Sequence, residues 1–420
     1  MKIIYLWIIT LVLLSNFSYG QTQWTKYQNN PVLTKGPSNN DIIAIGQPTC
    51  LFENDTIKMW YAGVGADMKA RIFYATSPDG INWTKYNNGT PVLDVGNTGE
   101  WDCGWLDTPE IVKGPKGYLL YYYGDTTQQS PEISSAYGAA TSPDGINWTK
   151  YQGNPIFKKD TSIDWEAKWV ESPAVLYDSL TSTYQMWYNG VAKNWLIKIG
   201  YATSTDGFNW TRYSGNPVFS VGSGGSFDDM WLGTPAIIHR NNLFELWYSG
   251  FSSISGFDTI RVGYATSPDG INWMKYSGNP LFDTYSPPYD SLIDKGGPWA
   301  PDVVYIPSSD IYKMFYEAEG GFSLAASPNT TNVNAVKILP DDEIIIYPYP
   351  ASSNFTITTF INFHKANLKI FNVLGEAVLI KENLDGNEFQ FELKNFPAGI
   401  YFISLSDKDK TLSKSIFFSN

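Results

Sequence analysis

Short segments with alternating apolar and polar positions recur along this chain. The clearest is YATSPDGINWTKY at 74–86, and similar copies lie at 138–151, 200–213 and 263–276. The turns of these copies open with a serine every 62 to 65 residues: Ser77, Ser142, Ser204 and Ser267. Alternation on both sides of a tight turn predicts a β-hairpin. Repeats of this length, made of short aromatic strands, predict a propeller or a similar array.

The geometry of a tight turn accounts for each residue of the Ser-Pro-Asp-Gly motif. Proline suits the second position, aspartate accepts N–H groups within the turn, and glycine supplies a positive φ. We therefore interpret the repeated aspartate as scaffold and not as a functional site.

Each repeat predicts four strands. The first follows a proline, the second is aromatic, the third ends in Ala-Thr-Ser, and the fourth contains Trp-x-Lys/Arg-Tyr. A weaker fifth copy around Ser327 lacks the fourth strand, and residues 24–33 (WTKYQNNPVL) match that strand. We expect 24–33 to complete blade five, because closure removes exposed sheet edges. The prediction is an all-β chain with a five-bladed β-propeller at 21–335, its blades ending near residues 93, 157, 219, 282 and 333.

Composition restricts location and partners. Residues 1–20 combine Lys2, an apolar run and a small-x-small site, which predicts a secretory signal peptide. A net charge of −12 argues against nucleic acid or an anionic membrane as partner. No other apolar run is long enough to span a bilayer. Cys50 and Cys103 are either a disulfide or two buried thiols.

Residues 336–420 contain short strands without the blade repeat, which predicts a small C-terminal β-sandwich. This segment resembles the C-terminal sorting domain of the type IX secretion system of Bacteroidetes. The matching motifs are Tyr347-Pro348-Tyr349-Pro350, where Tyr349 replaces the usual Asn, then Ile370-Phe371-Asn372 with Gly375, and Pro397-Ala398-Gly399-Ile400-Tyr401. The resemblance implies passage through the periplasm, the type IX machinery as a partner, and a final location at the cell surface or outside.

The start of strand one and the end of strand two share one face of a propeller meander, so we expect a site there. Two positions before the strand-one prolines stand Gly46, Asp107, Glu171, Gly233 and Trp299. Asp107 and Glu171 would be carboxylates on adjacent blades, the pairing needed for acid–base cleavage of a glycosidic bond. The surrounding indoles are candidates either for stacking on sugar rings or for plugging the channel: Trp105, Trp169, Trp231 and Trp299.

With these hairpins, aromatic strands and blade number, residues 24–335 resemble the five-bladed glycoside hydrolase propellers of families 32, 43 and 130. The resemblance to family 43 implies Glu171, in Glu171-Ser172-Pro173, as general acid and Asp107 as its modulator. The general base of that family directly precedes the first-blade proline, where this chain has Gln47. A glutamine cannot take a proton from water, so Gln47 is expected to bind substrate and not to act as the base.

Three functions follow from this departure. Asp41 could supply the base of a glycosidase acting on oligo- or polysaccharides. The protein could be a phosphorylase like family 130, with Arg71 and Lys193 either as phosphate ligands or as solvated surface charges. It could also be a propeller that binds glycans without cleaving them.

Other candidates have simpler explanations. Glu317 ends strand two of blade five and is a reserve acid and a substrate-binding candidate. Alternation along strand one should turn Glu110 and Asp302 away from the side of Asp107. Three acidic–aromatic pairs recur before strand one and indicate packing: Trp101-Asp102, Asp164-Trp165 and Phe227-Asp228. His239 lacks the spacing of a metal site. We expect no cofactor and no metal in the site, and leave a structural ion in the central channel open.

Overall fold

A computed structural model describes residues 23–126, 135–253, 260–283, 297–328, 344–347, 354–372, 377–392, 399–408 and 411–418. The predicted signal peptide at 1–20 and the expected end of blade five near residue 333 lie outside these ranges. The chain divides into two units, Met1–Pro328 and Asn329–Asn420. Within the described ranges, no helix is both long and apolar enough to cross a membrane.

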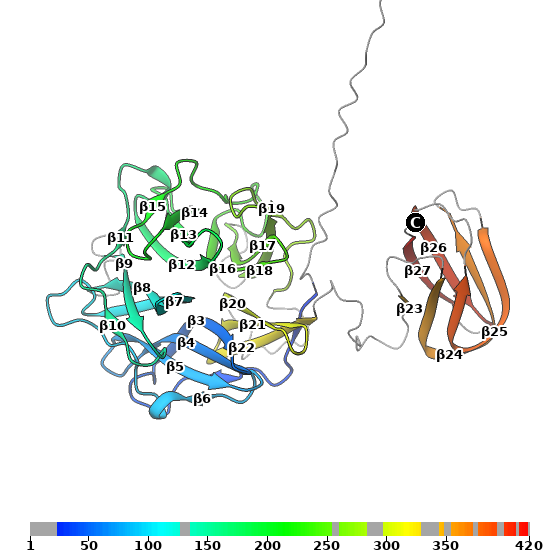
Figure 1. The fold of residues 1–420 in the computed structure, drawn as a ribbon, viewed down its shortest axis with the longest axis horizontal. Coiled ribbons are helices and arrows are strands. Elements are labelled where there is room, and N and C mark those ends of the chain that lie inside the picture. Colours follow the sequence, from blue (N-terminus) through cyan, green and yellow to red (C-terminus); the bar gives the residue numbers. More distant parts are fainter. Residues whose placement is uncertain are drawn as a thin grey trace, which may run out of the picture. The chain divides into compact units, whose positions relative to one another are not determined.

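The first unit consists of antiparallel strand groups arranged around a centre (Figure 1). We number these groups blades 1 to 5. Blades 1 and 2 contain β3 (Ala44–Glu53), β4 (Thr56–Val64), β5 (Ala70–Ser77), β6 (Thr84–Lys85), and then β7 (Trp105–Gly114), β8 (Gly117–Asp125), β9 (Ala136–Ser142), β10 (Thr149–Lys150) and β11 (Phe157–Lys158). Blades 3 and 4 contain β12 (Trp169–Asp178), β13 (Thr183–Val191), β14 (Ile197–Ser204), β15 (Thr211–Arg212), and then β16 (Trp231–Arg240), β17 (Leu243–Phe251), β18 (Arg261–Ser267) and β19 (Met274–Lys275).

Blade 5 is completed from the N-terminal side of the chain. Its inner strands are β20 (Trp299–Ile306), β21 (Ile311–Ala318) and β22 (Gly321–Pro328), and β22 pairs with β1 (Thr25–Lys26) and β2 (Leu33–Thr34). Thr25 lies opposite Ala326, and Leu33 lies opposite Phe322. The first strands contact one another in the cyclic order β3, β7, β12, β16, β20, β3. The all-β propeller predicted from the repeats is confirmed.

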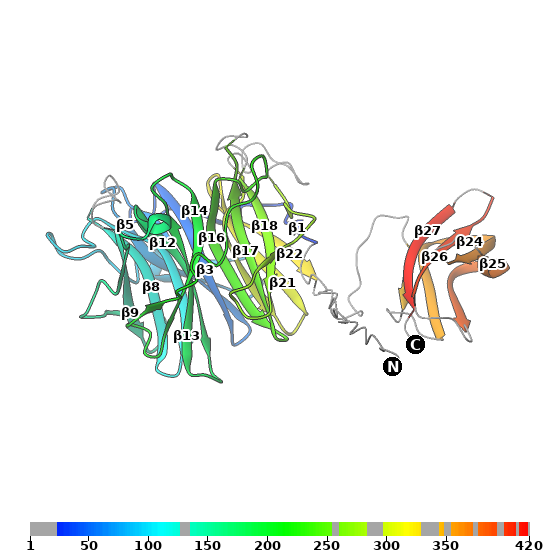
Figure 2. The same ribbon diagram turned by 90° about the horizontal axis from the view of Figure 1, so that it is seen from above.

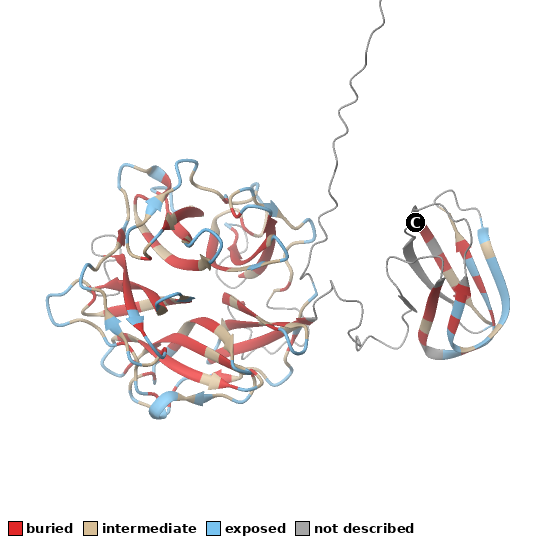
Figure 3. Cartoon of the chain, viewed as in Figure 1, coloured by how far each residue is buried: buried red, intermediate tan, exposed pale blue. Residues whose placement is uncertain are grey.

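The repeated turn clamps neighbouring blades together. Asp79 Oδ1 accepts hydrogen bonds from the N–H groups of Ile81 and Asn82, both at 2.8 Å. The buried Trp60 of blade 1 donates its indole N–H to the carbonyl of Gly145 in the blade 2 turn, at 2.8 Å. Trp187 of blade 3 does the same to Gly270 of blade 4, at 2.6 Å. These contacts support a scaffold role for the repeated motif, and Figure 3 shows the buried strands that it joins.

The second unit is a separate small β structure (Figure 2). Its strands are β23 (Ile344–Tyr347), β24 (Asn354–Phe371), β25 (Ala377–Glu392), β26 (Gly399–Ser406) and β27 (Thr411–Phe418). They pair in the order β23, β24, β26, β27, and β25 pairs with β24. Phe355, Ile357, Leu368 and Ile403 belong to its own apolar core.

Candidate active site

Each first strand carries a one-residue bulge at its proline. In β7, Asp107 pairs with Tyr123 and the next paired residue, Glu110, lies opposite Tyr121. The residue before the proline has a positive φ between 42° and 55° in all five strands: Gln47, Thr108, Ser172, Thr234 and Ala300. Such strain in non-glycine residues often marks functional sites, but here it also occurs in blades without a carboxylate at the bulge. We therefore assign the bulge to the scaffold that aims the neighbouring side chains.

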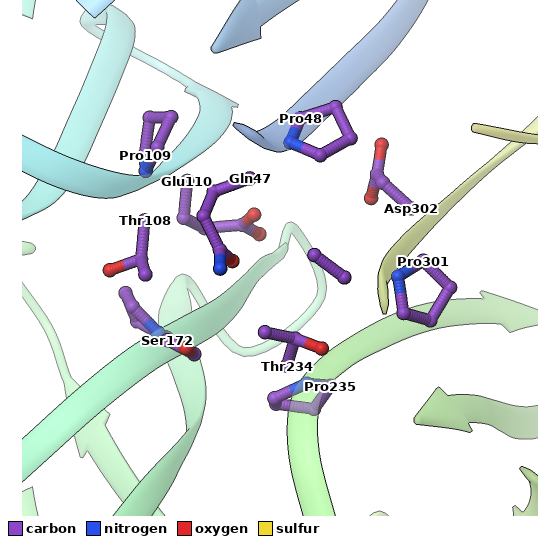
Figure 4. Close-up of a pocket in the computed structure, with 12 residues that line it drawn as sticks. Gln47, Pro48, Thr108, Pro109, Glu110, Ser172, Thr234, Pro235, Pro301 and Asp302 are labelled. Atoms are coloured by element: carbon purple, nitrogen blue, oxygen red, sulfur yellow. The ribbon is translucent and has the colours of Figure 1, made fainter. Parts of the chain in front are cut away.

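The five strained residues and their prolines surround a small central cavity of about 30 Å³, room for one water (Figure 4). Glu110 and Asp302 also line it. The expectation that alternation turns these two residues away was wrong. The bulge inserts one extra residue between Asp107 and Glu110, which returns Glu110 to the side of Asp107.

Glu110 and Asp302 are held by the structure around the channel. Glu110 accepts hydrogen bonds from the Thr49 hydroxyl, at 3.1 Å, and from the Val175 N–H, at 2.7 Å. These bonds link blades 1, 2 and 3. Burial raises the pKa of Asp302 to about 7, although its contact with Cys50 opposes the shift. Cys50 and Cys103 are free thiols, so the structure does not contain the disulfide alternative.

Asp107 and Glu171 occupy the same position in adjacent blades. Trp105 donates its indole N–H to Asp107 Oδ2 at 3.1 Å, and the Thr108 N–H donates to Oδ1 at 2.8 Å. Trp169 is the side-chain hydrogen-bond partner of Glu171. The pattern Trp-x-Asp/Glu therefore fixes both carboxylates, because an indole two residues earlier in the strand donates to each.

Glu317 joins these two carboxylates from blade 5. Its Oε2 accepts a hydrogen bond from the Gln47 N–H at 3.3 Å. A Cβ added to Gly46 would lie 2.5 Å from the same oxygen, so Glu317 fills the space that a side chain at position 46 would need. A carboxylate thus occupies the space two residues before the first-blade proline, where the sequence carries a glycine.

The electrostatics of these three groups are coupled. Burial, and then the Asp107 charge, raise the pKa of Glu171 to about 7, against the Trp169 hydrogen bond. Burial and the same Asp107 charge raise the pKa of Glu317 to about 7. Burial also raises the pKa of Asp107 itself. The structure therefore brings Asp107 within electrostatic reach of both Glu171 and Glu317, as expected at an acid–base site.

Trp299 covers Gly233, the blade 4 glycine at the position that corresponds to Gly46. A Cβ at Gly233 would lie 3.0 Å from the Trp299 ring. Blade 5 thus fills both glycine positions, with Glu317 over Gly46 and Trp299 over Gly233. Trp105 is buried, whereas Trp169, Trp231 and Trp299 are partly exposed.

Asp41 does not join this group. It has 0% exposure, pairs with Lys85 at 2.5 Å and lies 3.5 Å from the Tyr61 hydroxyl. The same arrangement recurs in the next blades as Asp102–Tyr122–Lys150, Glu166–Tyr188–Arg212 and Asp228–Tyr248–Lys275. A sealed, ion-paired carboxylate cannot activate a water, so the expected base role of Asp41 was wrong. In blade 3 the buried acid is Glu166, and Asp164, named from the sequence, is exposed.

We expect Asp41→Asn to destabilise the protein by about 3 kcal/mol, because it leaves the Lys85 ammonium partly buried without its counter-ion. Chemical denaturation followed by tryptophan fluorescence measures this free energy of unfolding. The matched control is Asp67→Asn, which breaks a half-exposed pair with Arg71 and should cost less than about 1 kcal/mol. Equal effects of the two variants would contradict the structural assignment of Asp41.

The two candidate phosphate ligands are both engaged in ion pairs. Arg71 pairs with Asp67 at 2.7 Å and with Asp94 at 2.8 Å. Lys193, which is 64% exposed, pairs with Asp164 at 2.7 Å. His239 stacks on Phe244, with the ring centroids 3.9 Å apart. In the part of the chain that the structure describes, no group of three or more His, Cys, Asp or Glu residues could hold a metal ion.

Comparisons with known proteins support two of the assignments. Residues 345–419 match the family described as "Secretion system C-terminal sorting domain". This segment is a sorting domain. Its presence indicates type IX secretion to the cell surface or outside.

The propeller has the fold of glycoside hydrolases. A structure from the GH130 family of mannoside phosphorylases, which contains glycoside hydrolases that target β-1,2 mannosidic linkages in Candida mannan, is 22% identical, with a TM-score of 0.58 over 77% of this chain and 98% of that one. A putative glycoside hydrolase from Parabacteroides distasonis is 18% identical, with a TM-score of 0.58 over 74% and 97% of the two chains. An uncharacterized protein of Mycobacterium tuberculosis is 24% identical over 57% of this chain and 77% of its own length.

Sequence reasoning reached Asp107 and Glu171 through the blade alignment but underrated Glu317. The signal for Glu317 was available, because the matching positions in the other blades are Ala62, Tyr123, Asn189 and Ser249.

Proposed function

We propose that the propeller is a glycoside hydrolase with Glu171 as general acid and Glu317 as general base. The observation that carries this proposal is the hydrogen bond from the Gln47 N–H to Glu317. It puts a carboxylate beside the residue that, by resemblance to family 43, stands at the position of the base. Asp107 lies in the same group and makes both glutamates easier to protonate. The glycoside hydrolase fold of the unit agrees with this chemistry.

The proposed reaction uses both glutamates once. The protonated Glu171 donates its proton to the glycosidic oxygen as the bond to the anomeric carbon breaks. The ionised Glu317 takes a proton from a water whose oxygen bonds to that carbon. The products are two shorter sugars, and proton exchange with solvent restores the starting states. Burial, with the Asp107 charge, keeps the pKa of Glu171 high enough for it to hold the proton.

Hydrolysis is favoured over phosphorolysis by the charges of the site. Arg71 and Lys193 are each engaged by aspartates near their own loops. The negative charges of ionised Asp107 and Glu317 repel a phosphate dianion unless nearby cations compensate for them. A water nucleophile meets no such repulsion.

The rate should depend on pH as a bell centred near pH 7. Lowering the pH protonates Glu317 and removes the base, and raising it ionises Glu171 and removes the acid, because the pKa of each lies at about 7. Measuring kcat/KM from pH 5 to pH 9 tests this. An unchanged rate above pH 8 would argue against a neutral Glu171 as proton donor.

The substrate is sought with a panel of arabino-, xylo-, fructo- and manno-oligosaccharides, including β-1,2-linked mannosides. We expect the full-length protein to release new reducing ends from at least one of them without added phosphate. Saturable binding without release would favour the alternative, a propeller that binds glycans without cleaving them. If the protein neither binds nor cleaves any sugar of the panel, the proposal is overturned for these sugars.

A further inference from the structure

Trp195 is an exposed tryptophan in a fixed position. It lies in the short connection between β13 and β14, with 49% of its surface exposed. Its φ is +69°, a strained value for a bulky residue. Its backbone N–H donates to the Ala192 carbonyl at 2.9 Å. A solvent-exposed indole on a strained turn adds little to the stability of the fold. Its fixed position is therefore better explained by contact with a ligand.

A departure from the blade repeat holds this turn. In blades 2 and 3 the indole at the start of strand one, Trp105 or Trp169, bonds a carboxylate two residues later. Blade 4 has Gly233 at the carboxylate position. Its indole, Trp231, donates instead to the Trp195 carbonyl at 3.0 Å. The missing acid of blade 4 thus frees an indole N–H that anchors Trp195.

The Trp195 ring is also fixed by its neighbours. Lys168 Nζ lies 3.8 Å from its centroid, a close cation–π contact. Trp169 meets it edge to face, with centroids 5.6 Å apart and an angle of 72° between the rings. Trp169 in turn bonds Glu171. A continuous chain of contacts therefore runs from the exposed indole to the acid.

We propose that Trp195, with Trp169 beside it, is the stacking platform for the first sugar of the leaving group. This inference rests on the proposed function, because a general acid must touch the leaving-group oxygen and so marks the leaving-group side of the cut bond. Sugar rings present apolar C–H faces that pack on flat indoles. The substrate class is then an oligo- or polysaccharide with a sugar, and not a small alcohol, as the leaving group.

The test compares two leaving groups on the sugar that the panel identifies. For the oligosaccharide, Trp195→Ala should lower kcat/KM by about 10- to 50-fold, and Trp195→Phe should restore most of it. For the glycosyl fluoride of the same sugar, Trp195→Ala should stay within about twofold of wild type, because fluoride does not reach the platform. The fluoride rate also reports that the variant is folded. The control is Tyr213→Ala. Tyr213 is a half-exposed aromatic residue that directly follows β15 of blade 3, and its replacement should leave both rates unchanged.

The outcomes separate the two proposals. If wild type cleaves an oligosaccharide and Trp195→Ala cleaves it equally fast, the platform is wrong and the hydrolase stands. If Trp195→Ala slows both substrates equally, Trp195 acts on the scaffold and the platform is again wrong. If wild type cleaves nothing in the panel, the proposed function falls and this inference falls with it.

Discussion

Replacing Glu171 with glutamine should lower kcat/KM for an oligosaccharide by about 10²- to 10⁴-fold, the usual contribution of a positioned proton donor. Glutamine has nearly the same shape and can still accept the Trp169 hydrogen bond. What it lacks is the proton that the leaving sugar oxygen requires. The rate constants come from reducing-end assays on the purified full-length protein.

The control for this variant uses both another residue and another substrate. Glu319→Gln changes an exposed glutamate two residues beyond Glu317 and should keep the wild-type rate. Glycosyl fluorides should remain good substrates of Glu171→Gln, because fluoride leaves with little help from an acid. A loss of equal size on oligosaccharide and fluoride would assign Glu171 a role other than proton donation.

Replacing Glu317 with glutamine should be as damaging, and it should damage both substrates. The base acts on the attacking water, so a better leaving group does not relieve its loss. We expect at least a 10²-fold fall in kcat/KM for the oligosaccharide and for the fluoride. The acidic limb of the pH profile should also disappear, because that limb belongs to the protonation of Glu317.

Replacing Glu317 with the smaller residue alanine provides a second test of its role as the base. Glu317→Ala opens space above Gly46, and added azide should restore turnover and give a glycosyl azide, since azide needs no base. Wild-type activity in Glu317→Gln would exclude Glu317 as the base and would assign water activation to another group.

The repeats made the fold predictable from the sequence. Ser-Pro-Asp-Gly turns and aromatic second strands encode their own local structure, and the hairpins need no long-range information. The sorting domain was predictable for a different reason, because its motifs resemble those of a known family, and the comparison bears this out.

The candidate site was less predictable, because it depends on a bulge and on contacts between distant blades. Without the one-residue shift before Glu110, alternation assigns that side chain to the wrong side. Glu317 approaches Gln47 across 270 residues of sequence, and the two glycine positions that make room for blade 5 looked like gaps in the pattern. Asp41 looked available only because its partner, Lys85, lies in a different segment of the chain.

The identity of the nucleophile tests the central claim most directly. The full-length protein is incubated with the cleaved oligosaccharide and excess inorganic phosphate, and the products are identified by mass spectrometry. If Glu317 activates water opposite Glu171, wild type yields free sugars at a rate that phosphate does not change, and Glu171→Gln yields almost none. Sugar phosphates as the main product, or bound oligosaccharide that stays intact, would contradict the account.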